Sequence, residues 1–172
     1  MAKLPGDYIA GFVDGEGCFA LKFRRDIKYH RPNTPVYFSW DIEFAIGLRS
    51  DDKELLKKIQ VALECGNISV NRRGMARYSV QRIGDLTSKI VPFFDKYQLH
   101  GKKQFDYKLW KEAVEIFGRN QRTAVNIRKG ERRFHKTEWD PKDIKRLGEI
   151  QREMKPYKSK RAEWKWLMPT GS

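Results

Sequence analysis

The sequence has little cysteine and no apolar run long enough to span a membrane. Its two cysteines, Cys18 and Cys65, fit no metal-ligand spacing and favour a reducing compartment, so we expect both to be packing residues. No stretch approaches the roughly 20 apolar residues that a spanning helix needs, and no signal peptide is expected before Leu4. These absences exclude a cysteine-ligated metal centre and a membrane-embedded protein.

Acidic residues are outnumbered by basic ones, and the imbalance indicates the kind of partner. The 172 residues include 36 basic and 22 acidic ones, which gives a formal net charge of +14. Nucleic acid is the leading partner for such a balance, and an anionic membrane surface is second. Residues 122–172 are the most densely basic part and either contact a nucleic-acid backbone or form a solvated tail. The length and the 40% hydrophobic content predict one globular domain with a real core.

Residues 8–17 join an apolar helix to two acids at its end. Gly11 and Gly15 lie four apart on one helix face, and small residues at this spacing let a second helix approach closely. Asp14 and Glu16 face the negative end of the helix dipole, which is unfavourable without a cation. We interpret this pattern as a metal site shared between two chains.

The remaining chain reads as a mixture of helices and half-buried strands. We predict a helix over 7–15 capped by Asp7, strands over 18–24 and 36–46 joined by a polar loop, a helix from Ser50, a hairpin pairing 68–72 with 76–81 across Arg73-Gly74, and helices over 85–91, 102–117 and from Asp140. Alternating apolar and polar residues along the strands indicate one buried face and one open face. The acid-ended helix occurs once, so a two-fold symmetric homodimer is the simplest way to double it.

The segment Ile9-Ala10-Gly11-Phe12-Val13-Asp14-Gly15-Glu16-Gly17 resembles, position by position, the signature of the LAGLIDADG homing endonucleases. The segment from Leu99 to Tyr107 is similar to the start of a helix whose lysine approaches the active site in that family. The resemblance covers about residues 4–118 and implies an α+β fold of order αββαββα, with a twisted antiparallel four-stranded DNA-binding saddle backed by helices. We therefore predict an endonuclease core over 1–121. From the charge of the remaining residues and the Asp140-Pro141 pair we predict a basic extension with one helix over 122–172, packed on the core.

The resemblance also implies the catalytic residues and the metal. Glu16 is the expected metal ligand, beside Gly15, and Asp14 and Lys103 are the expected catalytic partners. Asp14 either caps the partner helix or fixes the turn, and Lys102 is the neighbouring candidate to Lys103. Mg²⁺ is the expected cofactor because hard oxygen ligands suit it, with Mn²⁺ as an alternative and Ca²⁺ binding without supporting cleavage.

One departure from the family concerns a glutamine that holds solvent near the metal in many relatives. The corresponding position here is Leu48, so either Arg49 substitutes for the glutamine or the contact is missing.

The open faces of the two hairpins and the loop beside them are the expected DNA-reading surface, because a β-ribbon fits the major groove. The residues expected to contact DNA are Lys22, Arg24, Arg25, Lys28, Arg31, Ser39, Asp41, Glu43, Ser69, Asn71, Arg73, Arg77, Ser79 and Gln81. The residues expected at the dimer interface are Tyr8, Gly11, Phe12 and Gly15.

The resemblance implies an intron-encoded, site-specific endonuclease that cuts double-stranded DNA as a homodimer, inside a prokaryotic (above all archaeal) cell or an organelle. The first alternative is an intron RNA-splicing maturase or a non-catalytic DNA-binding regulator on the same scaffold; only this alternative requires RNA as a partner. The second alternative, a basic protein of the membrane surface, has little support because the basic residues lie on strands as well as helices.

Overall fold

The computed structural model describes residues 3–27, 36–120 and 139–154. Its elements are α1 (Gly6–Glu16), β1 (Gly17–Ile27), β2 (Val36–Arg49), the short 3₁₀ turn η1 (Ser50–Asp52), α2 (Lys53–Leu63), β3 (Asn67–Val70), β4 (Met75–Val80), the continuous helical run α3 (Ile83–Asp85), η2 (Leu86–Ile90) and α4 (Val91–Lys96), then α5 (Lys103–Asn120) and α6 (Pro141–Glu153). None of the described helices has the length and hydropathy needed to cross a membrane.

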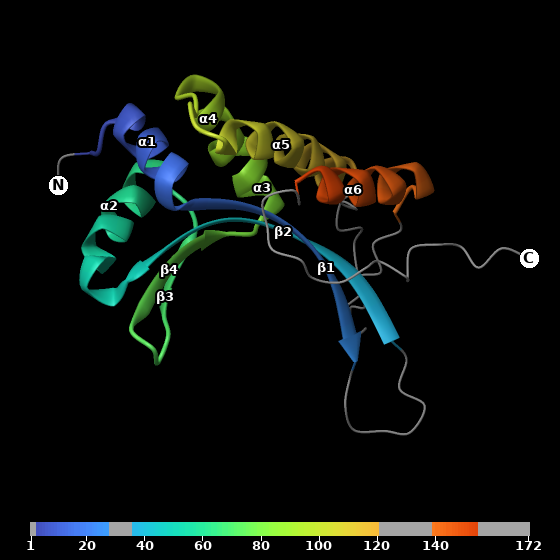
Figure 1. Cartoon of the computed structure of the whole chain (residues 1–172), viewed down its shortest axis with the longest axis horizontal. Helices are drawn as coiled ribbons and strands as arrows, with labels where there is room; N and C mark the ends of the chain where they lie inside the picture. Colours follow the sequence, from blue (N-terminus) through green and yellow to red (C-terminus); the bar gives the residue numbers. More distant parts are fainter. Residues whose placement is uncertain (1–2, 28–35, 121–138, 155–172) are drawn as a thin grey trace, which may run out of the picture.

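The four strands form one antiparallel sheet in the order β1-β2-β4-β3. Figure 1 shows this sheet bent into an arch, with the helices on its outer side and the inner side free of described helices. The α+β class and the αββαββα order predicted from the sequence are therefore confirmed. The arch places one concave face of the sheet opposite the helical layer.

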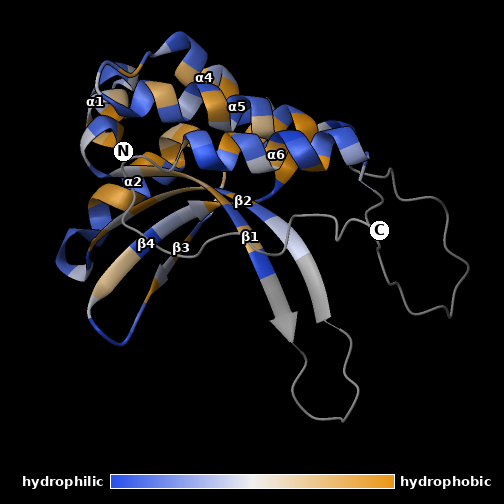
Figure 2. Cartoon of the chain, turned by 45° about the vertical axis from the view of Figure 1, so that its right-hand side comes forward, coloured by the Kyte–Doolittle hydropathy of each residue, from blue (hydrophilic) through white to orange (hydrophobic). Residues whose placement is uncertain are grey.

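The core lies between the outer face of the sheet and the helices. Phe19 and Phe44 from neighbouring strands stack with ring centroids 5.3 Å apart, and Trp110 of α5 packs on Phe19 at 5.1 Å. All three side chains are almost fully buried. Figure 2 shows hydrophobic and hydrophilic positions alternating along α5 and α6, as expected of helices with one face on a core.

Several predicted boundaries differ from those observed. Asp7 does not cap α1: the cap position is Pro5, and no side chain caps the helix. Strands β1 and β2 run three residues further than predicted, to Ile27 and Arg49, because partners across the sheet continue their ladders. The helix predicted to end before Pro92 continues through it: Pro92 directly follows the π-helical segment η2, whose wider turn interrupts the regular i→i−4 hydrogen bonds.

The turn of the second hairpin spans Asn71 to Gly74 rather than Arg73-Gly74 alone. The Asn71 side-chain oxygen accepts hydrogen bonds from the backbone N–H groups of Arg73 (2.9 Å) and Met75 (3.0 Å). Gly74 has a φ of +72°, which glycine adopts without strain. This local bonding explains why the strands end at Val70 and begin again at Met75.

Helix α6 packs against α5 and β1. Asp140 caps it, as predicted, by accepting a hydrogen bond from Lys142 N at 2.8 Å. Leu147 and Ile150 are fully buried, and Gln151 donates to the carbonyl oxygen of Leu21 at 3.0 Å. The helix of the basic extension thus contributes to the common core; the division at residue 121 stays a prediction.

Asp143 of α6 forms hydrogen bonds with the end of α5. It accepts a hydrogen bond from Arg119 Nε (2.9 Å), a second from the same guanidinium, and one from Asn120 Nδ2 (2.6 Å). Hydrogen bonds from Arg119 and Asn120 lower the pKa of Asp143 to about 2, below the ordinary 3.8. A lowered folded-state pKa contributes stability that is present above the unfolded value and is lost as pH falls through the folded one.

We therefore expect Asp143→Asn to lower the melting temperature by about 3–10 °C at neutral pH, from the loss of charged hydrogen bonds. The difference from the unmodified chain should shrink as pH falls from about 4 to 2. Thermal unfolding followed by circular dichroism across this window measures it, with the exposed Asp52→Asn as the control. An equal difference at the acid end of this window and at neutral pH would contradict the role given to the carboxylate.

Candidate active site and nucleic-acid interface

Helix α1 has one buried face and one exposed face. Ile9, Ala10 and Val13 are buried against the core. On the other side Tyr8 is 48% exposed, and its ring lies 6.3 Å from that of Phe12. The four residues predicted at a dimer interface, Tyr8, Gly11, Phe12 and Gly15, thus lie along the outward side at helical spacing. A methyl group added at Gly11 or Gly15 would meet no atom within 4 Å, so this face is open to a second helix.

The end of α1 brings together the three predicted catalytic residues. Figure 1 shows α1 descending to the sheet, where β1 begins directly after Glu16. Lys103, the first residue of α5, donates from Nζ to the carbonyl oxygens of Asp14 (2.9 Å) and Gly15 (2.6 Å). Its ammonium therefore supplies the cation that the negative end of the α1 dipole requires.

Asp14 fixes the end of α1 to the loop before α5. Its Oδ2 atom accepts hydrogen bonds from the backbone N–H groups of His100 (2.7 Å) and Gly101 (3.1 Å). A Cβ at position 101 would lie 3.1 Å from Asp14 Oδ1, a tight contact that favours glycine at this position. The sequence does not indicate that His100 and Gly101 bind Asp14, because 86 and 87 residues separate them from it. Of the two roles expected for Asp14, holding the turn within its own chain is the one the geometry displays.

The acids at this end suit a hard divalent cation. The Glu16 side chain is exposed and has no bond to any described residue. Asp14 Oδ1 is buried without a hydrogen-bond partner among the described residues. Carboxylate oxygens are the ligands that Mg²⁺ and Ca²⁺ prefer. No cluster of three or more His, Cys, Asp or Glu side chains occurs in the described part of one chain, so a complete site would need ligands from outside it.

The concave face of the sheet carries most of the predicted DNA-reading residues. Strand register places Lys22 opposite Asp41, Arg24 opposite Ser39, and Arg77 opposite Gly47. The same pairing and the two-residue alternation place on this face Lys22, Arg24, Ser39, Asp41, Glu43, Ser69, Arg77 and Ser79. Gln81 follows directly after β4 and joins this surface through Glu43.

The two acidic side chains of the concave face form ion pairs with basic side chains of the same face. Asp41 forms an ion pair with Arg24. Glu43 is only 5% exposed and binds Lys22, Arg77 and Gln81. Burial would raise the pKa of Glu43, but hydrogen bonds from Arg77 and Lys22 hold that pKa below its ordinary value. Glu43 is therefore a charged centre within the face, a role that its place in the alternating pattern did not reveal.

Other predicted contacts have different surroundings. Arg25 was expected in a loop but lies within β1, where it pairs with Phe38. Asn71 serves the hairpin turn, and Arg73 is exposed beside it. Lys28, Arg31 and the basic residues 122–138 and 155–172 lie outside the described residues, so the structure gives no account of those contacts.

Leu48 is the position at which the resemblance to the family implies a glutamine. Leu48 packs against the core. Arg49 is exposed and forms an ion pair with Asp51 at 2.9 Å. Arg49 is thus paired within its own chain. Substitution of the glutamine by Arg49 and loss of the contact both stay predictions.

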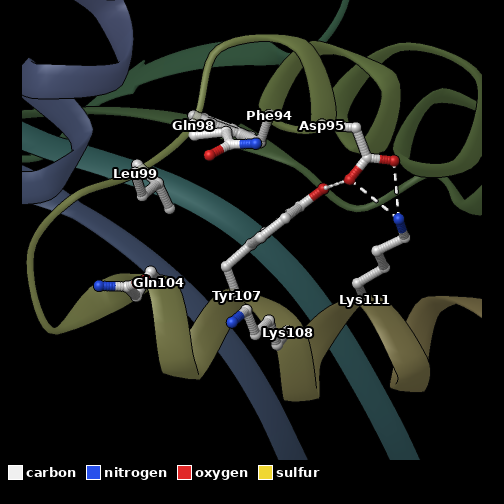
Figure 3. Close-up of a pocket in the computed structure, with 8 residues that line it drawn as sticks. All are labelled: Phe94, Asp95, Gln98, Leu99, Gln104, Tyr107, Lys108 and Lys111. Carbon is white, nitrogen blue, oxygen red and sulfur yellow. Dashed lines mark hydrogen bonds and ion pairs between the residues drawn. The ribbon is translucent and has the colours of Figure 1, made fainter.

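A pocket of about 350 Å³ lies in the helical layer, apart from these residues. Figure 3 shows Asp95 held there by the Tyr107 hydroxyl (2.9 Å) and by Lys111 Nζ (2.7 Å). These bonds outweigh the effect of partial burial and lower the pKa of Asp95. The pocket lining contains none of the predicted site residues, so it is not the candidate active site.

Lys103 offers a direct test of the site's geometry. We expect Lys103→Met, which keeps the length and removes the charge, to slow the DNA cleavage predicted from the sequence by about 10–100-fold, the effect of losing about 1.5–3 kcal/mol of charged hydrogen bonding. Single-turnover cleavage measures it. Lys108→Met, on the exposed side of the same helix, is the control. Equal rates for both variants would show that the ammonium has no part in the reaction.

Comparison with known proteins agrees with this geometry. The family model described as LAGLIDADG endonuclease matches residues 9–114. A probable intron-encoded endonuclease 2 of Neurospora crassa is 31% identical over 128 residues, which are 72% of this chain and 27% of that protein. The crystal structure of the I-LtrWI LAGLIDADG homing endonuclease bound to target DNA matches with a TM-score of 0.69 at 23% identity, over 91% of this chain and 46% of that one. The homing endonuclease I-TnaI matches with a TM-score of 0.69 at 24% identity, over 90% of each chain.

The α+β arch, one antiparallel sheet backed by helices, is the fold of LAGLIDADG homing endonucleases, as the structural matches show. This chain belongs to the LAGLIDADG endonuclease family. It spans about a quarter of the length of the Neurospora crassa relative. That relative comes from a fungus, so the comparison gives no support to the expected prokaryotic source.

Proposed function

We propose that this chain is a site-specific endonuclease that cuts double-stranded DNA as a homodimer with Mg²⁺ and acts within the cell on an intron insertion site. The observation that carries this proposal is the exposed Glu16 carboxylate, presented by a Lys103-capped helix end at the edge of a concave basic sheet. Family membership adds support. Electrostatic attraction to phosphates then supplies most of the affinity, and the sheet supplies base contacts.

Each residue at the end of α1 has a distinct task in this proposal. Glu16 provides carboxylate oxygens that would hold the cation, and Asp14 keeps the helix end in place through His100 and Gly101. Lys103 adds positive charge where phosphate charge develops. When bound, Mg²⁺ supplies Lewis-acid charge stabilisation and lowers the pKa of water. The open face of α1 brings a second Glu16 close by pairing with the same face of another copy.

Cleavage of a plasmid library with a randomised insert tests the proposal and requires no assumed target sequence. Purified chain should produce double-strand breaks at one family of related, nearly two-fold symmetric sites when Mg²⁺ is present. EDTA should abolish the cuts, Mn²⁺ should support them, and Ca²⁺ should permit binding alone. Binding should weaken steeply with salt, by about 0.9 in log affinity per neutralised phosphate for each tenfold rise in salt.

The RNA-splicing alternative makes the opposite prediction in the same assay. A maturase or a DNA-binding regulator has no need of an exposed Glu16 beside Lys103, so these residues favour the nuclease. Tight binding of intron RNA with no Mg²⁺-dependent cutting of any library member would contradict the proposal and support this alternative.

A further inference from the structure

A four-residue network lies at the centre of the concave face, which we call the Glu43 cluster: Glu43 with its partners Lys22, Arg77 and Gln81. Glu43 Oε2 accepts from Lys22 Nζ at 3.1 Å and from Arg77 Nη2 at 2.8 Å. Glu43 Oε1 accepts from Gln81 Nε2 at 3.2 Å. Lys22 lies in β1, Glu43 in β2 and Arg77 in β4, and Gln81 directly follows β4. The Glu43 carboxylate therefore connects three strands of the sheet.

The acid of the cluster is hidden, whereas its cations are not. The Glu43 side chain is 7% exposed, but those of Lys22 and Arg77 are 50% and 44% exposed. Both carboxylate oxygens are occupied, which leaves Glu43 little capacity to read a base itself. Each partner keeps further N–H donors, since lysine has three, arginine five and glutamine two. The cluster therefore presents ordered donors and a net positive charge to whatever occupies the arch.

Ordering donors before binding has a thermodynamic consequence. A long side chain loses rotamer freedom when an interface immobilises it, and this loss weakens binding. A side chain that Glu43 already holds loses less rotamer freedom when DNA binds. It also reaches fewer positions on the DNA, because its orientation is fixed. The exposed pair of Asp41 and Arg24 is weaker in this respect, because Asp41 is 39% exposed and solvent screens the attraction.

We propose that Glu43 is a positioning residue for sequence recognition: it holds its three partners in one arrangement, so that they read a single contiguous group of base pairs in the major groove. This role rests on the proposed function. Arginine and lysine suit guanine edges, and glutamine suits adenine. Without the carboxylate the cations turn to phosphates, which position a protein without specifying sequence.

Selection from a pool of randomised duplex DNA, carried out with the full chain and Ca²⁺, tests this role. We expect Glu43→Gln to lose at least about tenfold in preference at one contiguous group of base pairs and to keep its preferences elsewhere. Its affinity for random-sequence duplex should hold or rise, and its salt dependence should steepen by about 0.9 for each additional phosphate that the released cations neutralise. Glu54→Gln, which makes the same charge change at an exposed position of α2, should match the unmodified chain.

The outcomes separate this role from the proposed function. If the unmodified chain selects a sequence and Glu43→Gln selects the same one with the same salt slope, the positioning role is wrong and the function stands. If the unmodified chain selects no sequence, both fail. Should Glu43→Gln not fold, Lys22→Met and Arg77→Met provide the test, since both side chains are about half exposed. Each should lose preference at the same group of base pairs, and losses at separate groups would overturn the role.

Discussion

Glu16→Gln is expected to reduce DNA cleavage below detection while target binding persists. The substitution keeps the size of the side chain and removes the negative charge that would hold the cation. Loss of one group that stabilises transition-state charge costs about 10²–10³ in rate, and the loss of a metal ligand adds to it. Single-turnover cleavage with Mg²⁺, beside binding measured with Ca²⁺, gives both quantities.

The site explains why binding should survive this change. Glu16 is exposed and makes no bond to a described residue, so its substitution disturbs no packing. Asp7→Asn, an exposed acid in the first turn of the same helix, is the matched control and should cut normally. A Glu16→Gln variant that cuts at the normal rate would remove this residue from the chemistry.

Gly11→Arg is expected to convert the protein into a folded monomer that no longer makes double-strand breaks. Gly11 lies on the open face of α1, where an added Cβ meets nothing within its own chain. Across a two-fold axis, however, the two arginines would hold the paired helices apart and repel each other. We expect self-association to weaken by at least about 100-fold, which corresponds to roughly 2.7 kcal/mol.

Analytical ultracentrifugation measures the effect on association, and thermal unfolding checks the fold. Arginine favours a helix more than glycine does, so the single chain should not be destabilised. Gly118→Arg makes the same change at an exposed glycine of α5 that also has nothing within 4 Å, and it should leave association and cleavage intact. A Gly11→Arg variant that remains a dimer and cuts both strands would place the interface elsewhere.

Much of the fold was predictable from the sequence because its signals are local. Alternation along 36–46 identified β2, and the Asp140-Pro141 pair marked the start of α6, since each pattern depends on neighbouring residues alone. The ends of the strands were less predictable, because the hydrogen bonds between two strands continue only as far as both strands extend. The extension of β1 to Ile27 depends on its pairing with Val36 across the sheet, which the sequence of β1 does not contain.

The sequence indicated the residues of the candidate site, whose roles stay predictions, but it did not indicate their hydrogen bonds. The motif at 9–17 indicated Glu16, Asp14 and the helix face, and the structure adds that Lys103 caps this helix. Bonds between distant segments leave no pattern in the chain. The anchoring of Asp14 by the loop before α5 and the burial of Glu43 among three partners are both of this kind. Glu43 looked like one more polar residue on an open face because alternation reports the face and not its contacts.

The most direct test of the central claim is a crystal structure of the chain on a duplex selected from the cleavable library, grown with Ca²⁺. Two copies should pair through α1, with the Glu16 carboxylate oxygens about 2.3–2.6 Å from calcium ions that also contact the phosphates at the cut positions. Glu16 side chains far apart, with no cation between them and those phosphates, would contradict it.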